Sequence, residues 1–238
     1  MAKGTRSCVS PLRRLSLQTV ALALSLLLLM GSTVTGTMAW MMLKTDPVAN
    51  TFTIGNISIT LDEARADENG QIPDPNDRIP AANQPTAQNV YPLRAGASYT
   101  KDPRVTVKQG SDDSWLFVQI EQSANYSTFM EPYAVADGWT ELDAAQYPGV
   151  YYRHVNAADL QTADAQFDVL AGNVIRLKTG FTQQDVDALT QQTDYPRLTV
   201  TAYAIQRDLA ADTTAPAAWQ QILAERTAAL RATENTAP

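Results

Sequence analysis

Hydrophobic and polar residues alternate along several short segments of this chain. Residues 50–61 carry apolar side chains at positions 52 and 54, and then at positions 57, 59 and 61. An apolar residue at every second position is the pattern of a half-buried β-strand. Because the alternation changes parity around Gly55, we expect one strand with a bulge or a sharp bend at this glycine.

The same alternation predicts further strands along the chain. Between positions 115 and 120 both faces are largely apolar, so Ser114–Glu121 is expected to lie centrally in a sheet or to have one face beneath another segment. The turn residues Gly110–Asp113 separate it from Arg104–Lys108 and predict a hairpin. Many short strands separated by turns indicate an all-β sandwich or barrel. Four more strands are predicted at residues 149–155, 166–170, 174–178 and 198–205.

Three other segments depart from the strand pattern. Residues 62–90 hold four prolines and few large apolar side chains, which predicts a long loop outside the core. Thr182–Thr190 is typical of a short connecting helix with Thr182 as its N-cap. Residues 216–231 begin with a proline and predict a helix that docks on the strands. The apolar residues at helical spacing in this segment are Trp219, Ile222, Leu223 and Leu230.

The N-terminal segment has the features of an export signal. Four basic residues precede an apolar run from Val20 to Met30, and Thr37 and Ala39 place small side chains three positions and one position before a cleavage point. We expect cleavage after Ala39, so that the mature chain begins at Trp40. The alternative is an uncleaved anchor, because no charged residue occurs from Leu15 to Leu43.

Composition limits the partners of the exported chain. The sequence has 18 Lys and Arg against 25 Asp and Glu, a formal net charge of −7 at pH 7, and loss of the basic leader makes the remainder more acidic. An acidic surface repels phosphate backbones and anionic lipid heads. We therefore expect no nucleic-acid partner, and membrane contact only through an uncleaved leader.

Residues that support enzymatic chemistry are scarce. The single cysteine, Cys8, lies in the leader, so the mature chain has no disulfide, zinc–thiolate site or cysteine nucleophile. The single histidine, His154, lies in a strand-like segment, where alternation explains it as an ordinary residue, and no His-Glu-x-x-His sequence is present. We predict that the protein is not an enzyme and has no catalytic residue, no metal ligand and no cofactor.

Two other groups of residues have alternative interpretations. Asp62–Glu63 and Asp112–Asp113 offer oxygen ligands for calcium, but neither pair matches an EF-hand loop and acids in turns are usually solvated. Aromatic residues on strands could form a sugar-binding platform, although core packing or cross-strand pairing is the commoner role. These aromatic residues are Trp115, Tyr151, Tyr152 and Tyr203.

Several motifs together resemble a known family. The leader ending at Gly36–Trp40, the dipeptide Thr45–Asp46 and the segment Asn50–Gly55 resemble exported proteins processed by a SipW-type signal peptidase, the TasA/camelysin family. Further motifs resemble the body of a branch of that family. They are Tyr91–Gly96, Tyr99–Pro103, Val105–Val107, Trp115–Val118, Ala134–Trp139, Val150–Arg153 and Leu198–Tyr203.

The resemblance implies a fold, a location and a role. It implies an all-β, jelly-roll-like antiparallel β-sandwich, here with a short connecting helix and a C-terminal helix. It also implies a protein that is secreted to the extracellular matrix or cell surface and self-associates into biofilm-matrix fibres, and the absence of cysteine from the exported chain favours a Gram-positive bacterial source. In such fibres the N-terminal segment of one subunit adds as a strand to its neighbour. The chain departs from the matrix protein TasA in its Pro-rich insertion and its C-terminal helix.

Physical reasoning supports strand addition independently of the family. An open sandwich leaves unpaired backbone groups at its edge strands, and an extended segment from another copy can satisfy them. The assembly strand would use Trp40, Leu43, Phe52, Ile54, Ile57 and Ile59. The alternative is that residues 50–61 pair only within their own domain. The second function considered is a cell-surface-anchored β-sandwich binding module, and a secreted hydrolase ranks last for want of a site.

These expectations divide the chain into five parts. They are a signal peptide over residues 1–39, an N-terminal strand and possible donor segment over 40–61, a Pro-rich loop over 62–90, the sandwich body over 91–208, and a C-terminal helix with a polar tail over 209–238.

Overall fold

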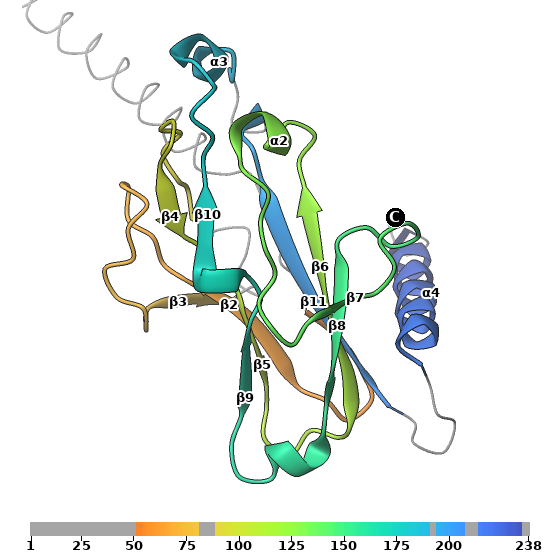
Figure 1. Ribbon diagram of the computed structural model, residues 1–238. Helices are drawn as coiled ribbons and strands as arrows, with labels where there is room; N and C mark the ends of the chain where they lie inside the picture. The colour runs from red at the N-terminus through yellow and green to blue at the C-terminus, as the bar shows by residue number, and fades with distance from the viewer. Residues whose placement is uncertain (1–50, 81–88, 191–193, 208–213, 235–238) are drawn as a thin grey trace, which may run out of the picture. The chain divides into compact units, whose positions relative to one another are not determined.

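Two β-sheets face each other in the computed structural model, which describes residues 51–80, 89–190, 194–207 and 214–234 (Figure 1). All of these residues belong to one unit of the chain, Lys44–Pro238. The first sheet has five strands in the order β1-β11-β6-β8-β7. Its strands are β1 (Thr51–Ile54), β6 (Ser114–Gln122), β7 (Thr140–Glu141), β8 (Val150–Val155) and β11 (Leu198–Gln206).

The second sheet has four strands in the order β3-β2-β5-β9, and β4 and β10 form a separate two-stranded sheet. Every strand pair is antiparallel except β1 with β11, which is parallel. The all-β prediction is confirmed, but the expectation of purely antiparallel pairing is wrong at this pair. These strands are β2 (Ile59–Ala64), β3 (Arg78–Pro80), β4 (Ser98–Thr100), β5 (Arg104–Val107), β9 (Ala165–Asp168) and β10 (Val174–Arg176).

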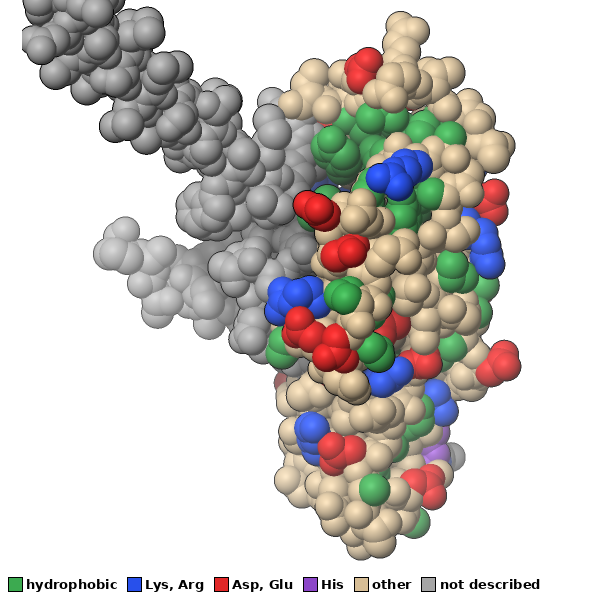
Figure 2. All heavy atoms as spheres, turned by 90° about the vertical axis from the view of Figure 1, so that its left-hand side faces the viewer, with side chains coloured by type: hydrophobic (Ala, Val, Ile, Leu, Met, Phe, Trp, Pro, Cys, Tyr) green, Lys and Arg blue, Asp and Glu red, His purple; other side chains and the backbone are tan. Residues whose placement is uncertain are grey.

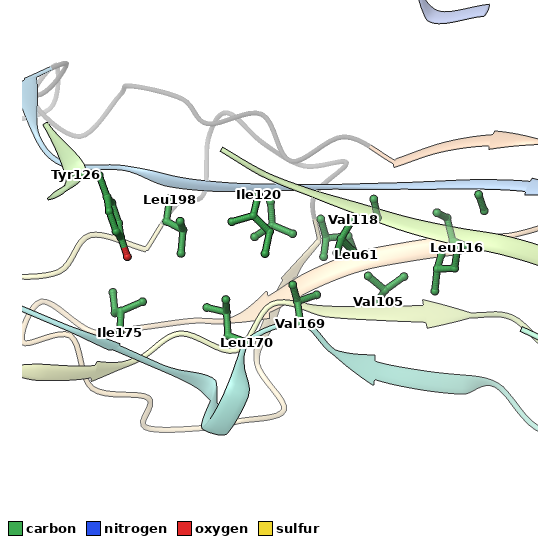
Figure 3. Packing of buried hydrophobic residues seen from close by; sticks show 14 of the residues in the cluster. Leu61, Val105, Leu116, Val118, Ile120, Tyr126, Val169, Leu170, Ile175 and Leu198 are labelled. Carbon is green, nitrogen blue, oxygen red and sulfur yellow. The ribbon is translucent and has the colours of Figure 1, made fainter. Parts of the chain in front are cut away.

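The main core lies between the two larger sheets. Figure 3 shows Leu61 and Val105 of the second sheet pointing toward Leu116, Val118 and Ile120 of the first. All five side chains are buried. Each strand contributes alternate residues to this core, as a period of two along a half-buried strand requires.

A second hydrophobic cluster covers the outer face of the five-stranded sheet. Helix α4 (Ala215–Glu234) places Trp219 and Ile222 against Phe117 and Tyr203, and all four side chains are buried. The ring of Trp219 lies 5.2 Å from both Phe117 and Tyr203, measured between centroids. The expected docking of the C-terminal helix and the central position of β6, apolar on both faces, are therefore confirmed.

The parity change at Gly55 marks a crossing between sheets. Strand β1 belongs to the five-stranded sheet and β2 to the four-stranded sheet, so the expectation of one bent strand is wrong. Gly55 has a φ of +99°, and a Cβ built on it would meet the Cβ of Gln206 at 2.6 Å. A change of parity can therefore mark a change of sheet as well as a bulge. After Gly55 the apolar residues face the same core from the opposite sheet.

The expected hairpin is a second crossing. Strand β5 pairs with β2 and β9, whereas β6 pairs with β11 and β8. The hairpin prediction is therefore wrong, because turn residues do not reveal whether the next strand joins the same sheet. The two crossings are hydrogen-bonded to each other: Ser58 N donates to Ser111 Oγ at 3.1 Å, and Asp112 N donates to the Asn56 carbonyl at 3.1 Å.

Shorter elements complete the fold. Helix α3 (Gln183–Asp187) is capped by Thr182, whose side chain accepts from Asp185 N, which confirms the predicted connecting helix and its cap. Helix α2 (Tyr126–Phe129) was not predicted. Strand β3 lies inside the predicted Pro-rich loop and buries Ile79. Among the helices that the structure describes, none combines the length and apolarity needed to span a membrane.

We predict that Gly55→Ala destabilises the fold more than Gly110→Ala. Both glycines have positive φ, +99° and +79°, which costs an L-residue about 1–2 kcal/mol. A Cβ at Gly110 meets no atom within 4 Å, whereas at Gly55 it collides with Gln206. Urea unfolding of both variants measures the difference, and equal losses of unfolding free energy would contradict the close crossing at Gly55.

Candidate assembly edge

Strand β1 lies at the free edge of the five-stranded sheet. Its four residues pair in parallel with β11, with Phe52 opposite Tyr203 and Ile54 opposite Ile205. No other strand of the described residues pairs with β1. Parallel pairing is slightly less stable per residue than antiparallel pairing, and a four-residue strand forms few hydrogen bonds. Strand β1 is therefore held to its sheet by few backbone hydrogen bonds.

Two side chains of β1, Thr53 and Ile54, differ in burial. Ile54 is half-buried against the cluster beneath α4, and Thr53 is exposed. By contrast, Ala202 and Ala204 of β11 are fully buried beneath their own sheet. The edge of β11 is therefore part of the core between the sheets.

The edge of β11 is longer than the strand that pairs with it. All nine residues of β11 pair with β6, from Leu198 opposite Gln122 to Gln206 opposite Ser114. On the other side, β1 pairs only with Ala202–Ile205. Within the described part of the chain, no strand pairs with residues 198–201 on that edge. Backbone groups at such an edge are a template for an added strand.

The predicted assembly residues are divided between two environments. Ile57 and Ile59 belong to the core between the sheets and are only 7% and 6% exposed. Ile59 begins β2, which pairs with β3 on one side and β5 on the other. Donating β2 to another subunit would break both ladders, so the candidate donor segment is confined to β1 and the residues before it. Thr37, Ala39, Trp40 and Leu43 lie outside the described residues.

His154 belongs to a polar cluster at the end of the same sheet. Its Nε2 lies 2.9 Å from Asp113 Oδ2 and 3.3 Å from Arg207 Nη1. The amide of Ala157 donates to Asp113 Oδ1 at 3.0 Å, and the His154 ring packs on Trp115 with centroids 5.4 Å apart. These contacts hold the ends of β6, β8 and β11 together, so the role they indicate for His154 is to stabilise the fold.

Acidic residues considered as calcium ligands are engaged by other groups. Asp62 pairs with Arg78, Glu63 pairs with Lys101, and Asp112 accepts a hydrogen bond from Gln206 Nε2. Within residues 51–80, 89–190, 194–207 and 214–234, no three His, Cys, Asp or Glu side chains gather in a way that could hold a metal ion.

The four aromatic residues considered as a sugar platform do not share one surface. Tyr203 is buried beneath α4, and Tyr151 packs against the core between the sheets. Trp115 and Tyr152 lie side by side on the outer face, with ring centroids 5.6 Å apart at an interplanar angle of 73°. Packing within and against the sheet accounts for all four side chains.

Charge on one face of the molecule is mixed. Figure 2 shows Lys and Arg side chains interspersed with Asp and Glu side chains on the face that lies to the left in Figure 1. Among the described residues of this face, basic groups form no extended area of the kind that follows a phosphate backbone.

No family model matches the chain, and no curated protein or solved structure matches it significantly. The resemblance to the TasA/camelysin family rests on the sequence motifs and stays a prediction. Function must therefore be argued from the edge geometry and the composition of the chain.

We predict that Asp113 stabilises the fold above about pH 4. Burial raises the pKa of Asp113, but hydrogen bonds from His154 and Ala157 N and the charges of His154 and Arg207 outweigh it and hold the pKa below its ordinary value. A carboxyl with a lowered folded pKa contributes stability that is lost as pH falls through that value.

The measurement compares the wild type with Asp113→Asn by urea unfolding at pH 7 and pH 3. At pH 7 the variant should lose about 1.5–3 kcal/mol, as is typical for hydrogen bonds to a charged group. The difference should shrink at pH 3, because the carboxyl of the unfolded chain, with its ordinary pKa, is protonated there while the lowered pKa of the folded carboxyl resists protonation. A difference that is equal at both values of pH would show that this carboxylate contributes no ionic stabilisation.

Proposed function

We propose that this chain is a secreted, non-enzymatic structural protein of the extracellular or biofilm matrix, in which subunits join by N-terminal strand addition. The observation that carries the proposal is β1, a four-residue parallel strand at an edge of β11 that is more than twice as long as the strand it pairs with. The described fold supplies an acceptor edge, and the residues before Gly55 supply the donor.

The finer description of the fold belongs to the same proposal. We infer that the sandwich is jelly-roll-like, because the chain passes repeatedly from one sheet to the other. It crosses between β1 and β2, between β5 and β6, and between β8 and β9. Repeated crossing between facing sheets is what the Greek-key connections of a jelly roll produce.

Exchange of β1 between copies would cost little at equilibrium. A donor strand from a second copy forms the same hydrogen bonds with β11 as the strand of the same chain, so the ladder is satisfied in either arrangement. The balance then depends on protein concentration and on the conformation at Gly55, the residue that follows β1. A donor extended before Thr51 in the register of β1 would also satisfy residues 198–201, whether it comes from the same chain or from a second copy.

Export links this assembly to the leader. In the proposal a SipW-type signal peptidase cleaves after Ala39, recognising Thr37 and Ala39, and Trp40 becomes the first residue of the mature chain. Cleavage releases the segment that contains Trp40 and Leu43, so that it can extend the donor strand. Assembly would thereby begin only outside the cell.

One observation favours the second candidate, a cell-surface-anchored binding module. Both β1 and β2 pair within their own chain in the structure, so the described domain has no strand missing from its sheets. In that case the uncleaved leader would keep the sandwich at the membrane, and the loops would recognise a ligand. Whether the mature chain assembles distinguishes these two candidate functions.

We predict that a chain beginning at Trp40 forms filaments and that a chain beginning at Gly55 stays monomeric. The shorter chain lacks β1, and with it Ile54 of the cluster beneath α4, but it keeps Ile57, Ile59 and Leu61 of the core between the sheets. Size-exclusion chromatography and negative-stain electron microscopy measure the difference, and circular dichroism checks that both chains fold. Stable monomers from the longer chain would contradict strand-mediated assembly and favour the binding module.

A further inference from the structure

Arg153 of β8 bridges the two sheets of the sandwich. It pairs across the ladder with Leu116 of β6, which is buried in the main core, so both side chains leave the sheet on the same face. On that face the guanidinium reaches the opposite sheet, where its Cζ lies 3.7 Å from the centre of the Phe167 ring of β9. The contact is a cation–π interaction between the sheets.

The terminal nitrogens of Arg153 lie beside an exposed glycine. A Cβ built on Gly138 would lie 3.2 Å from Nη2 and 3.4 Å from Nη1 of Arg153. Any larger residue would therefore place its side chain against the outer end of the guanidinium, whereas glycine leaves that end without such a cover. Arg153 as a whole is half-buried, so its charge is held by the fold and still reaches the surface.

Arg153 has no acidic partner among the residues that the structure describes. Within this part of the chain its side chain forms no ion pair and no hydrogen bond, and its Nε is buried without an acceptor. Arg78 is the opposite case, because it pairs with both Asp62 and Asp102. Burial lowers the pKa of Arg153, and no neighbouring carboxylate opposes this effect. Arg153 is therefore a partly buried cation that no acidic group of the described residues balances.

The residues around the guanidinium are held in position. Trp139 Nε1 donates to the carbonyl of Asp168, the last residue of β9, at 2.9 Å. This bond keeps the Trp139 ring near Arg153, with 5.4 Å between the ring centre and Cζ. A cation that is already fixed between Phe167 and this loop loses less conformational freedom on binding than a mobile surface side chain does. The arrangement is thus preorganised for a ligand.

The donors of Arg153 and the ring of Trp139 fit different parts of one ligand. A guanidinium presents its N–H groups in a planar fork, which matches the two oxygens of a carboxylate. An indole ring offers a flat, mostly apolar surface, and small-molecule sites combine such surfaces with a few charged or polar groups. A ligand that carries a carboxylate next to a rigid ring with apolar C–H groups would use both. A sugar acid has this structure.

We propose that Arg153 and Trp139 bind a sugar acid of an extracellular polysaccharide, in which neutral sugars separate the acidic ones. The charge of the protein favours this spacing. The chain has 25 Asp and Glu against 18 Lys and Arg, so it repels a dense polyanion, whereas a single carboxylate can reach one cation. An acidic peptide is the alternative ligand, but its flexible side chain has no ring to place on Trp139.

This site is separate from the proposed assembly edge. In the five-stranded sheet β11 and β6 lie between β8, which carries Arg153, and β1. Binding therefore does not require strand exchange, and it can be measured on monomers or on filaments. Its success or failure leaves the result of the assembly experiment unchanged.

Isothermal titration calorimetry of the chain beginning at Trp40 tests the proposal. The probe is a gellan oligosaccharide, in which neutral sugars separate the glucuronates, and the neutral control is a dextran oligosaccharide of similar length. A short peptide with a single glutamate, blocked at both ends, is the third ligand. Gellan should bind saturably with a dissociation constant below about 1 mM, and dextran should bind at least about tenfold more weakly.

Three variants identify the cation that binds. Arg153→Gln removes the charge and should weaken gellan binding at least about tenfold, and Arg153→Lys keeps a charge over Phe167 but lacks the planar fork, so it should bind more weakly than the wild type. Arg65→Gln is the matched control, because it removes the same charge from a side chain that is 50% exposed and paired with Asp77. It should bind gellan as the wild type does. Circular dichroism checks that each variant is folded.

Three results would overturn the proposal. If wild-type protein binds gellan no better than dextran, Arg153 only joins the two sheets, and this comparison holds even if Arg153→Gln does not fold. Equal binding by folded Arg153→Lys and wild type would remove the planar fork from the site. Tighter binding of the glutamate peptide than of gellan would show that the ligand is a protein carboxylate and not a sugar acid.

Discussion

The β6–β11 ladder is the interaction on which the rest of the structure depends. Its nine residue pairs run the whole length of both strands, and both faces of the ladder are apolar. One face requires a facing sheet, which β2 and β5 supply. The other face requires a cover, which α4 supplies through Trp219 and Ile222. Burial on both sides makes β11 a rigid edge to which β1 can be added or from which it can be removed.

The crossings between sheets follow from that arrangement. A strand that leaves the five-stranded sheet must turn through the thickness of the core to join the other sheet, and Gly55 provides the backbone conformation for the first such turn. The second crossing is fastened to the first through Ser111 and Asp112. The pairing of β1 is therefore coupled to a short connection rather than to a long flexible linker, and this connection limits where an exchanged strand can go.

Local patterns in the sequence predict where strands and helices lie better than they predict which strands pair. Alternation locates β6, β8 and β11, helical spacing predicts the docking of Trp219, and Thr182 predicts a cap. These features depend on neighbouring residues. Alternation misassigns the crossing at Gly55, and the turn residues at Gly110 misassign the second crossing, because a change of sheet leaves the same local signal as a bulge or a hairpin. The parallel pairing of β1 has no local signal at all.

The polar network around Glu63 illustrates a second limit of sequence reasoning. Its members come from β2, from the segment that contains Asn89 and from the connection before β5, and nothing in their spacing indicates that they meet. A polar residue beside a predicted strand is normally assigned to solvent. From the sequence we expect the side chains of Asp62 and Glu63 to be solvated. In the structure Glu63 forms a largely buried ion pair with Lys101.

The central claim is that β1 must leave the edge of its own β11 before subunits can join. A disulfide between Thr53→Cys and Ala204→Cys would lock β1 in place, since these residues are paired and adjacent strands lie within the reach of a disulfide. In a chain beginning at Trp40 no other cysteine interferes. The account predicts that the oxidised protein stays monomeric and that reduction restores filaments. Filaments formed equally well by the oxidised monomer would contradict it.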